Sequence, residues 1–463
     1  MSDTKQNKID TLSITKAVIS HVLDTNQPEK DILALISDFS ISESITANTI
    51  SVSLSVTDKV GLLEDYPLRG EERVVLTVLD FMGTTITYDL FLYKIDSIKT
   101  ASESDGISYT LQLFSYQHFI AASNRIIRSF KDKKVVDLIN GLFTEFYKGE
   151  KNIRIEEESL ASDSLTDNLI RGTIPNFTVP QAIEFLVRRS YSTKRQSSSF
   201  RFFENSDSYF FISDEGLEEY AAKYKKVFNL TNSIVPDDPA FSEQQKNNLE
   251  TVTNTNRFNT LDDMFGGYYK NEVIEINILN RKVNLLADDN VYDYQKKGNS
   301  YFGDKKFRQI VDRHTKDFAD EFFTRENSKK FIVVKDYMDI GAFDDSALPG
   351  NRFYPDMISN RHAFRSHLNS VIVDAVGPPR LDICAGNIVN LDIVENNAKQ
   401  GTPESNKQLS GKYIVKSIAR VSEGDTSKNR YTLIKRDWNT TKSTIGYGAG
   451  QVDPRLANAV NRS

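Results

Sequence analysis

Histidine, cysteine and acidic side chains most often bind metals or catalyse reactions, and this sequence offers few of them in a useful spacing. Of the five histidines, His362 and His367 are the closest pair, five positions apart. On a helix this spacing turns the two side chains to different faces, whereas a zinc-binding pair needs a separation of four. His118 falls at the start of a predicted helix, where a buried structural histidine is the simpler interpretation. We therefore predict no metal site.

Other catalytic patterns are also missing from the sequence. The acidic pairs Asp237–Asp238 and Asp344–Asp345 lie in segments with Pro or Gly, which is typical of solvated turns. No nucleophile elbow, glycine-rich phosphate loop or dinucleotide fingerprint is present. Basic clusters such as Arg188–Arg189 are interpreted as solvated helix ends. We predict no catalytic residues, no cofactor and no cofactor-binding residues, and we do not expect an enzyme.

Length and composition limit the class of protein. The chain has 463 residues, enough for about two to four domains of roughly 100–200 residues each. Its 64 acidic and 58 basic residues give a net charge of −6, which argues against a globally basic nucleic-acid-binding protein. Cys384 is the single cysteine, so an internal disulfide framework is excluded. The polar N-terminus and the lack of long apolar runs predict neither a signal peptide nor a transmembrane segment.

The clearest structural pattern is the alternation of a half-buried strand. From Ile50 to Thr57 every second residue is apolar, and the residues between are serine or threonine. The segment 411–421 alternates in a similar way. These segments predict strands with one face in a core and the other face polar.

A similar order of strands occurs twice, in residues 67–115 and 379–438. Each copy begins with a Gly-containing turn, at Gly70 or Gly386, that leads into an apolar strand. A strand with Tyr, Lys and Ile follows (FLYKIDSI and KYIVKSIARV), then a loop and a closing strand with Tyr-Thr-Leu. The similarity lies in strand order more than in residue identity. Tandem β domains with unrelated roles would give the same pattern, so the repeat alone leaves a shared role open.

The pattern predicts a mainly β fold with an α+β part: two similar β-barrel domains separated by an α+β domain, plus an insertion and a C-terminal arm. Helical spacing is expected in residues 115–130 and 131–148, and Thr178 is a predicted N-cap with Pro180 in the first turn. The predicted division is a disordered N-terminus (1–12), a first β-barrel domain (13–115), an α+β domain (116–222), a second β-barrel domain (223–280 and 360–437), an insertion (281–359) and an extended C-terminal arm (438–463).

The order of barrel, α+β domain and barrel resembles the central baseplate or tail hub protein of contractile-tailed bacteriophages. Type VI secretion spike proteins share this hub fold. The resemblance is carried by ISVSLSVTDKVGLLEDYPLRGEE, by TIPNFTVPQAIEFLVRRS and by the ending AGNIVNLDIV, LSGKYIVKSIARV and YTLIKRD. With their surroundings these segments cover most of residues 32–222 and 360–437. The insertion and the C-terminal arm depart from the family, and the lack of a spike domain implies a separate spike protein.

The resemblance implies a structural role as a homotrimeric baseplate hub subunit of a contractile phage tail. Six β-barrels from three chains would form a pseudo-six-fold ring that joins the trimeric central spike to the hexameric tail tube. Expected partners are the chain itself, the spike, tail tube or tube-initiator proteins, baseplate wedge proteins and the tape-measure protein, with DNA only as cargo in the lumen. Candidate ring residues are the apolar positions of the barrel strands: Val52, Leu54, Val56, Val75, Leu92, Leu391, Tyr413 and Val415.

On this interpretation the protein belongs in the virion, in the tail baseplate, after assembly in the host cytoplasm. The acidic balance of the chain suggests an acidic lumen past which DNA can slide. Two alternatives stay open. One is the hub of a phage-like secretion or injection system. The other is a tail-associated cell-wall-degrading enzyme, which would need two carboxylates at glycosidase separation or a metal cluster.

Overall fold

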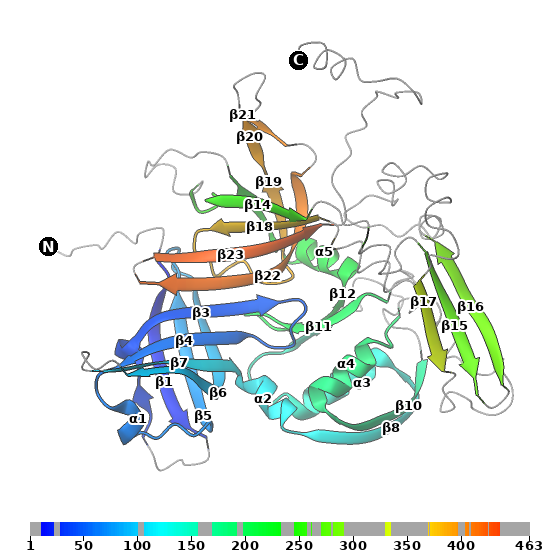
Figure 1. Cartoon of the computed structure of the whole chain (residues 1–463), viewed down its shortest axis with the longest axis horizontal. Helices are drawn as coiled ribbons and strands as arrows, with labels where there is room; N and C mark the ends of the chain where they lie inside the picture. Colours follow the sequence, from blue (N-terminus) through cyan, green and yellow to red (C-terminus); the bar gives the residue numbers. More distant parts are fainter. Residues whose placement is uncertain are drawn as a thin grey trace, which may run out of the picture.

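The fold is mainly β, as the sequence predicts, with short helices between groups of strands (Figure 1). The computed structural model describes residues 11–22, 28–100, 106–155, 169–191, 198–232, 245–256, 261, 270–278, 281–290, 329–334, 369, 371–396, 403–406, 409–424 and 426–435. The predictions for residues 1–10 and for the C-terminal arm lie outside this part of the chain, as do those for His362, His367 and the acidic pairs at 237–238 and 344–345.

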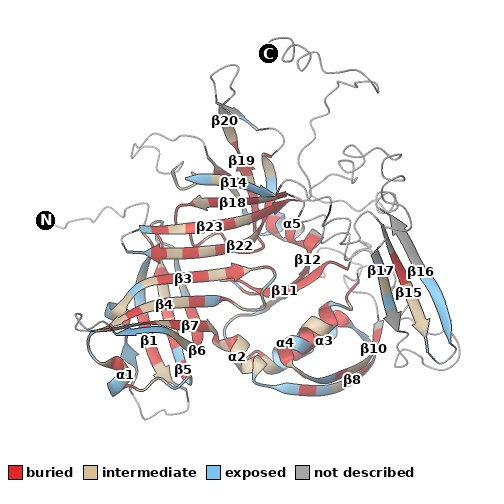
Figure 2. Cartoon of the chain, in the orientation of Figure 1, coloured by how far each residue is buried: buried red, intermediate tan, exposed pale blue. Residues whose placement is uncertain are grey.

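The first β unit is built from strands in which buried and solvent-facing residues alternate. In β4, Val52, Leu54 and Val56 are buried in the core of the unit, and the serines between them face the other side (Figure 2). The unit contains β1 (Ser13–His21), β2 (Lys30–Asp31), a 3₁₀ turn (Leu33–Leu35), β3 (Ile36–Ser44), β4 (Ser51–Asp58), α1 (Leu62–Asp65), β5 (Glu72–Leu79), β6 (Thr85–Thr100) and β7 (Ile107–Ser115).

The α+β part places helices against two small sheets. One sheet pairs β10 with β8, and the other has the order β11-β12-β9. Helix α4 begins after Thr178, whose backbone N–H donates to Gln181 Oε1 at 3.1 Å, and Pro180 lies in its first turn, as predicted. The elements are α2 (Tyr116–Ala122), β8 (Arg125–Lys134), α3 (Val135–Phe146), β9 (Ile153–Ile155), β10 (Leu169–Thr178), α4 (Val179–Val187), β11 (Phe200–Glu204), β12 (Tyr209–Ser213) and α5 (Asp214–Lys223).

The helix expected through residues 115–130 is only half correct. Helix α2 ends at Ala122, and the chain continues as strand β8. Ile126 and Phe130 are buried, whereas Ile127 between them is exposed. Buried and exposed residues alternate here, and the same three residues would also fit a helical turn. The chain forms a strand because it pairs with β10.

The second β unit draws its strands from two distant parts of the chain. They are β13 (Val227–Thr231), β14 (Thr251–Asn256), β18 (Val371–Gly377), β19 (Ile388–Asp392), β22 (Gly411–Glu423) and β23 (Thr426–Lys435). A two-stranded ribbon, β20 (Val394–Asn396) with β21 (Pro403–Ser405), extends from it. The core of this unit contains Leu391, Tyr413 and Val415.

One predicted boundary of the second unit needs correction. We placed residues 223–280 in it, but β15 (Lys270–Asn277) pairs with β16 (Lys282–Asn290) and β17 (Lys329–Val334) in a separate three-stranded sheet. The alternating apolar residues of β15 correctly indicate a strand, but alternation does not identify the partner strand. The last part of the 223–280 segment therefore belongs with the insertion.

The two β units share one strand order. Along the sheet it is β3-β4-β7-β6-β5-β1 in the first unit and β14-β18-β23-β22-β19-β13 in the second. They differ at the last strand, since β1 pairs antiparallel with β5 whereas β13 pairs parallel with β19. Pairing joins both units into a single 13-stranded sheet. The closure of each unit into its own barrel stays a prediction.

Candidate assembly surface at the junction of the β units

The two units meet where β22 pairs with β3. The pairing is antiparallel and runs from Ser417 opposite Ser44 to Ser422 opposite Phe39. Figure 1 shows the two strands side by side in the middle of the large sheet, although they are far apart in the sequence. The backbone hydrogen bonds of the sheet therefore continue from one unit into the other.

β22 reaches both units because it changes partner along its length. Its first residues, up to Ile414, pair with β19 inside the second unit. A register shift against β23 follows between Val415 and Ser417, and a shift of this kind bends a strand. Beyond the bend, the edge that β19 has left is taken by β3 of the first unit. The bend therefore creates the junction.

A buried ion pair lies across this junction. Arg420 Nη1 donates to Glu43 Oε1 at 2.6 Å, and both side chains are fully buried. The second carboxylate oxygen of Glu43 accepts from the backbone N–H of Ala385 at 3.2 Å. Arg420 also donates to the carbonyl of Ile383 at 2.8 Å, and Ser206 Oγ donates to Glu43. A buried charge pair is tolerated when further hydrogen bonds satisfy it, and here it fixes the register of β22 against β3.

The electrostatics of the pair follow from its burial. Burial opposes the charge on Arg420, but attraction to the Glu43 carboxylate outweighs it, so the pKa of Arg420 lies above its ordinary value. Burial also raises the pKa of the nearby Cys384 thiol to about 12. At neutral pH Cys384 is therefore an unreactive thiol. The thiol is buried at the start of the turn that leads into β19, where the backbone N–H of Asn387 donates to the Cys384 carbonyl at 3.1 Å.

The α+β part is connected to the same junction. Glu204 of β11 is fully buried, accepts from Lys151 Nζ at 2.7 Å and accepts from the backbone N–H of Ile50 at 3.2 Å. The next residue, Asn205, donates to the carbonyl of Ala385 at 2.9 Å. The hydroxyls of Tyr88 and Ser206 are 2.9 Å apart. All three parts of the chain thus contribute to one buried polar network, which holds them in one arrangement.

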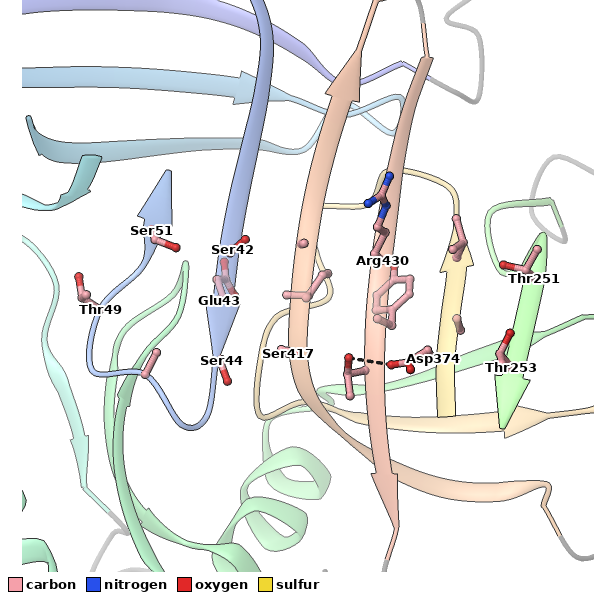
Figure 3. A pocket seen from close by; sticks show the side chains of 17 residues that line it. Ser42, Glu43, Ser44, Thr49, Ser51, Thr251, Thr253, Asp374, Ser417 and Arg430 are labelled. Atoms are coloured by element: carbon pink, nitrogen blue, oxygen red, sulfur yellow. Dashed lines mark hydrogen bonds between the residues drawn. The ribbon is translucent and has the colours of Figure 1, made fainter. Parts of the chain in front are cut away.

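A groove of about 520 Å³ lies over the junction (Figure 3). Three charged residues line it: Glu43 of the buried pair, Asp374, which accepts a hydrogen bond from Thr432 at 2.9 Å, and Arg430, which is exposed. Within the described residues no group of three potential metal ligands occurs. Eight of the 17 lining residues carry small hydroxyl groups: Ser42, Ser44, Thr49, Ser51, Thr251, Thr253, Ser417 and Thr432. Apolar residues such as Val376 and Ile418 also line the groove, and none of these residues suggests a reaction.

The predicted ring residues lie on strands of both units. Seven of the eight are buried in the two cores: Val52, Leu54, Val56, Leu92, Leu391, Tyr413 and Val415. The eighth, Val75 of β5, is half-buried and faces away from the core residues on either side of it. None of the eight takes part in the pairing of β22 with β3. Leu381 adds a further contact between the units, because it packs in the core of the first unit and its backbone N–H donates to Asp80 at 3.0 Å. The sequence analysis did not single out the pair Glu43–Arg420.

The histidine and the basic cluster that the sequence analysis considered as candidate sites contact neighbouring side chains of the fold. His118 is packed between the rings of Phe114 and Tyr147, and burial lowers its pKa. Arg188 donates to Glu184 at 3.0 Å, and the guanidinium of Arg189 lies over the Phe185 ring, 3.5 Å from its centroid. These basic residues sit at the end of α4, where a solvated helix end was expected. None of the described helices is long and apolar enough to cross a membrane.

No family model matches the sequence, and no curated protein is similar to it. In structure, the chain is similar to tail proteins of phages and prophages and to proteins related to the type VI secretion spike.

Two tail proteins match most of the chain. The tail protein from Neisseria meningitidis is 10% identical with a TM-score of 0.47, and the match covers 91% of this chain and 96% of that one. The 43 kDa tail protein of prophage MuSo2 from Shewanella oneidensis is 9% identical with a TM-score of 0.47, and the match covers 91% of this chain and 98% of that one. The E. coli type VI secretion component c3393, described as structurally similar to the T4 tail proteins gp27 and gp5, is 9% identical with a TM-score of 0.42 (93% and 78%). Likeness this weak does not decide a function.

Proposed function

We propose that the protein is a structural subunit of a phage tail or of a related injection machine, and that three copies form a ring with pseudo-six-fold symmetry. The observation that carries the proposal is the junction itself. Two units of one strand order are joined through unlike surfaces, β22 of one and β3 of the other. A contact between unlike surfaces can be repeated from unit to unit, and it terminates only when the repetition closes into a ring.

The proposed ring would place the sheet face that carries the groove toward the lumen. Serine and threonine side chains interspersed with small apolar residues leave a wall without dense charge, which suits the passage of a polymer. The expected charge of the lumen wall also changes. Glu43 is balanced by Arg420, and Asp374 lies in the groove with Arg430, so the acidic balance of the whole chain does not describe this face.

In the proposed assembly the hub stands between a trimeric central spike and a hexameric tail tube. Three-fold repetition of the chain would match the spike, and six β units would match the tube. Contacts with wedge, tube-initiator and tape-measure proteins, and a place in the virion baseplate, are parts of the same proposal. A secretion or injection machine with the same hub is a second device that this geometry fits equally well.

The experiment that tests the proposal is the mass of the purified chain. Light scattering after size exclusion is expected to give three chains per particle, alone or with its trimeric spike, and electron microscopy to give ring-shaped particles. A chain that stays monomeric even with the spike would contradict the proposal. A cell-wall hydrolysis assay of the same preparation would then test the enzyme alternative.

A further inference from the structure

In the described part of the chain, the internal junction leaves one matching surface of each β unit without a paired strand. In the second unit the junction uses the bent half of β22, and in the first unit it uses the edge strand β3. The same strand order gives each unit an equivalent of both surfaces. The first unit should therefore present an equivalent of β22, and the second unit an equivalent of β3. The register of the strand pairing identifies which strands carry these two surfaces.

The equivalent of β22 is β6. The pairing of β22 with β19 ends at Ile414, and the pairing of β6 with β5 ends at Phe91. Immediately after these residues both strands shift register against their other neighbour, between Val415 and Ser417 in one case and between Leu92 and Lys94 in the other. Two independent landmarks thus align the strands, and counting onward places Ile98 at the position of Val421.

The equivalent of β3 is β14. From Leu92 the cross-strand partners run through Leu113 and Val52 to Ile41 of β3. From Val415 they run through Leu433 and Val373 to Asn254 of β14. Asn254 therefore stands at the position of Ile41, and Thr253 at the position of Ser40.

Neither surface is paired with another strand in the part of the chain that the structure describes. The pairing of β6 with β5 stops at Phe91, and no described strand takes that edge from Lys94 to Thr100. Ile98 is an apolar side chain on this open edge and is 60% exposed, as expected of a position that pairing would cover. β14 is the outermost described strand at the other end of the sheet, and the side chains of Thr251 and Thr253 are exposed. Among the described strands, one strand half and one edge strand are therefore available to pair.

We infer that the second half of β6 in one chain pairs antiparallel with β14 of a second copy of the chain. In the internal junction Val421 lies opposite Ser40, so between chains Ile98 lies opposite Thr253. The inference rests on the proposed ring and names its interface: each chain contributes β6 at one side and β14 at the other. Every contact between neighbouring units then has the same form, within a chain or between chains.

β6 differs from β22 in one respect. It carries an additional register shift between Asp96 and Lys99, and Ser97 has a φ of 55°. Such an irregularity shortens a regular pairing and can move it by one position. We therefore expect the contact to centre on Ile98 and to tolerate a shift by one residue, and the test must tolerate it too.

The test is a cross-link between chains. The Ile98→Cys, Thr253→Cys double variant of the full chain is treated with a short bis-maleimide and analysed on a denaturing gel. Six strands separate β14 from β6 within one chain, so a short linker between the two sites joins different copies. Cys384 is buried and its pKa is about 12, so the unmodified chain serves as a blank.

Two matched variants control the experiment. Val421→Cys with Ser40→Cys places the same pair in the internal junction and should link within one chain, without a gain in mass. Thr87→Cys with Thr253→Cys uses the half of β6 that already pairs with β5, and it should link no chains. Mixing the two single variants Ile98→Cys and Thr253→Cys should give linked pairs only.

Mass and cross-link together separate the outcomes. A three-chain particle with a ladder that ends at three linked chains is the expected result. A three-chain particle that gives no link at Ile98 and Thr253, while the internal control links, would overturn the interface and leave the proposed ring standing. A ladder that continues beyond three would show the pairing without ring closure. A monomeric chain that gives no cross-links would contradict both the proposed ring and the proposed interface.

Discussion

At the scale of single residues, the pair Glu43–Arg420 shows how one buried contact can hold two parts of a chain. The two residues are 377 positions apart, and their 2.6 Å contact spans both β units. A lone charge in this position would be strongly unfavourable, because burial removes its hydration. The pair therefore fixes how the two β units are arranged relative to each other. Its contribution should be tested by replacing one partner and, separately, both partners.

We predict that Arg420→Met destabilises the protein by about 3–5 kcal/mol, because it leaves the Glu43 carboxylate buried without its partner. The double variant Glu43→Leu, Arg420→Met should recover most of this loss, since neither charge then remains. Urea unfolding followed by fluorescence measures both. Arg188→Ala is the control, because its pair with Glu184 is exposed and should be worth no more than about 1 kcal/mol. Equal losses in the single and double variants would show that packing, and not the charge pair, stabilises the junction.

A second prediction at this scale concerns pH. Burial lowers the pKa of His118 in the folded protein, and the nearby Glu204 only partly opposes this. As pH falls below the unfolded pKa of about 6.5, the unfolded chain binds a proton that the folded chain does not, so stability falls. His118→Phe should flatten the dependence of the melting temperature on pH between about 7 and 5.5. An unchanged slope in the variant would assign the acid sensitivity to another group.

At the scale of elements, alternation predicted the strands well and their partners poorly. The serine alternation of β4 predicts which side of the strand is buried, because burial on one face is a local property. The partner of a strand depends on the whole sheet, and so β15 was assigned to the wrong one. The pairing of β22 with β3 also depends on a bend that leaves no clear pattern in the sequence. For this reason the candidate ring residues fell in the cores, away from the junction.

The exposed half of β6 gives the prediction at this scale. Ile98→Asp should weaken association between chains at least tenfold while the chain keeps its fold, because it places a carboxylate in a strand edge that pairing would desolvate. The control is Thr87→Asp, in the half of β6 that β5 already covers and where the side chain is exposed. Sedimentation at several concentrations measures the association between chains, and the melting temperature shows whether the chain keeps its fold. Unaltered association of the Ile98→Asp variant would argue that this edge takes no part in the assembly.

At the scale of the whole molecule, the continuous sheet suggests what force would hold an assembly together. The described contacts of the junction include the backbone hydrogen bonds of β22 with β3, the buried pair Glu43–Arg420, and Leu381, which packs in the core of the first unit. Contacts between chains that copy this junction would share its physical character. Salt is then a direct probe, because at 1 M ionic strength exposed charges are screened over about 3 Å, whereas backbone pairing is little affected.

We therefore expect the particle to keep its mass when sodium chloride is raised from 0.15 to 1 M, and to dissociate on dilution or after Ile98→Asp. Light scattering at both salt concentrations, with the variant measured beside the unmodified chain, provides the test. Dissociation by salt alone would mean that exposed charges hold the copies together, as in the surface pair of Lys428 with Glu250 at 2.6 Å. The interface would then have to be sought on the rims of the units, because a continued sheet could not explain such a response.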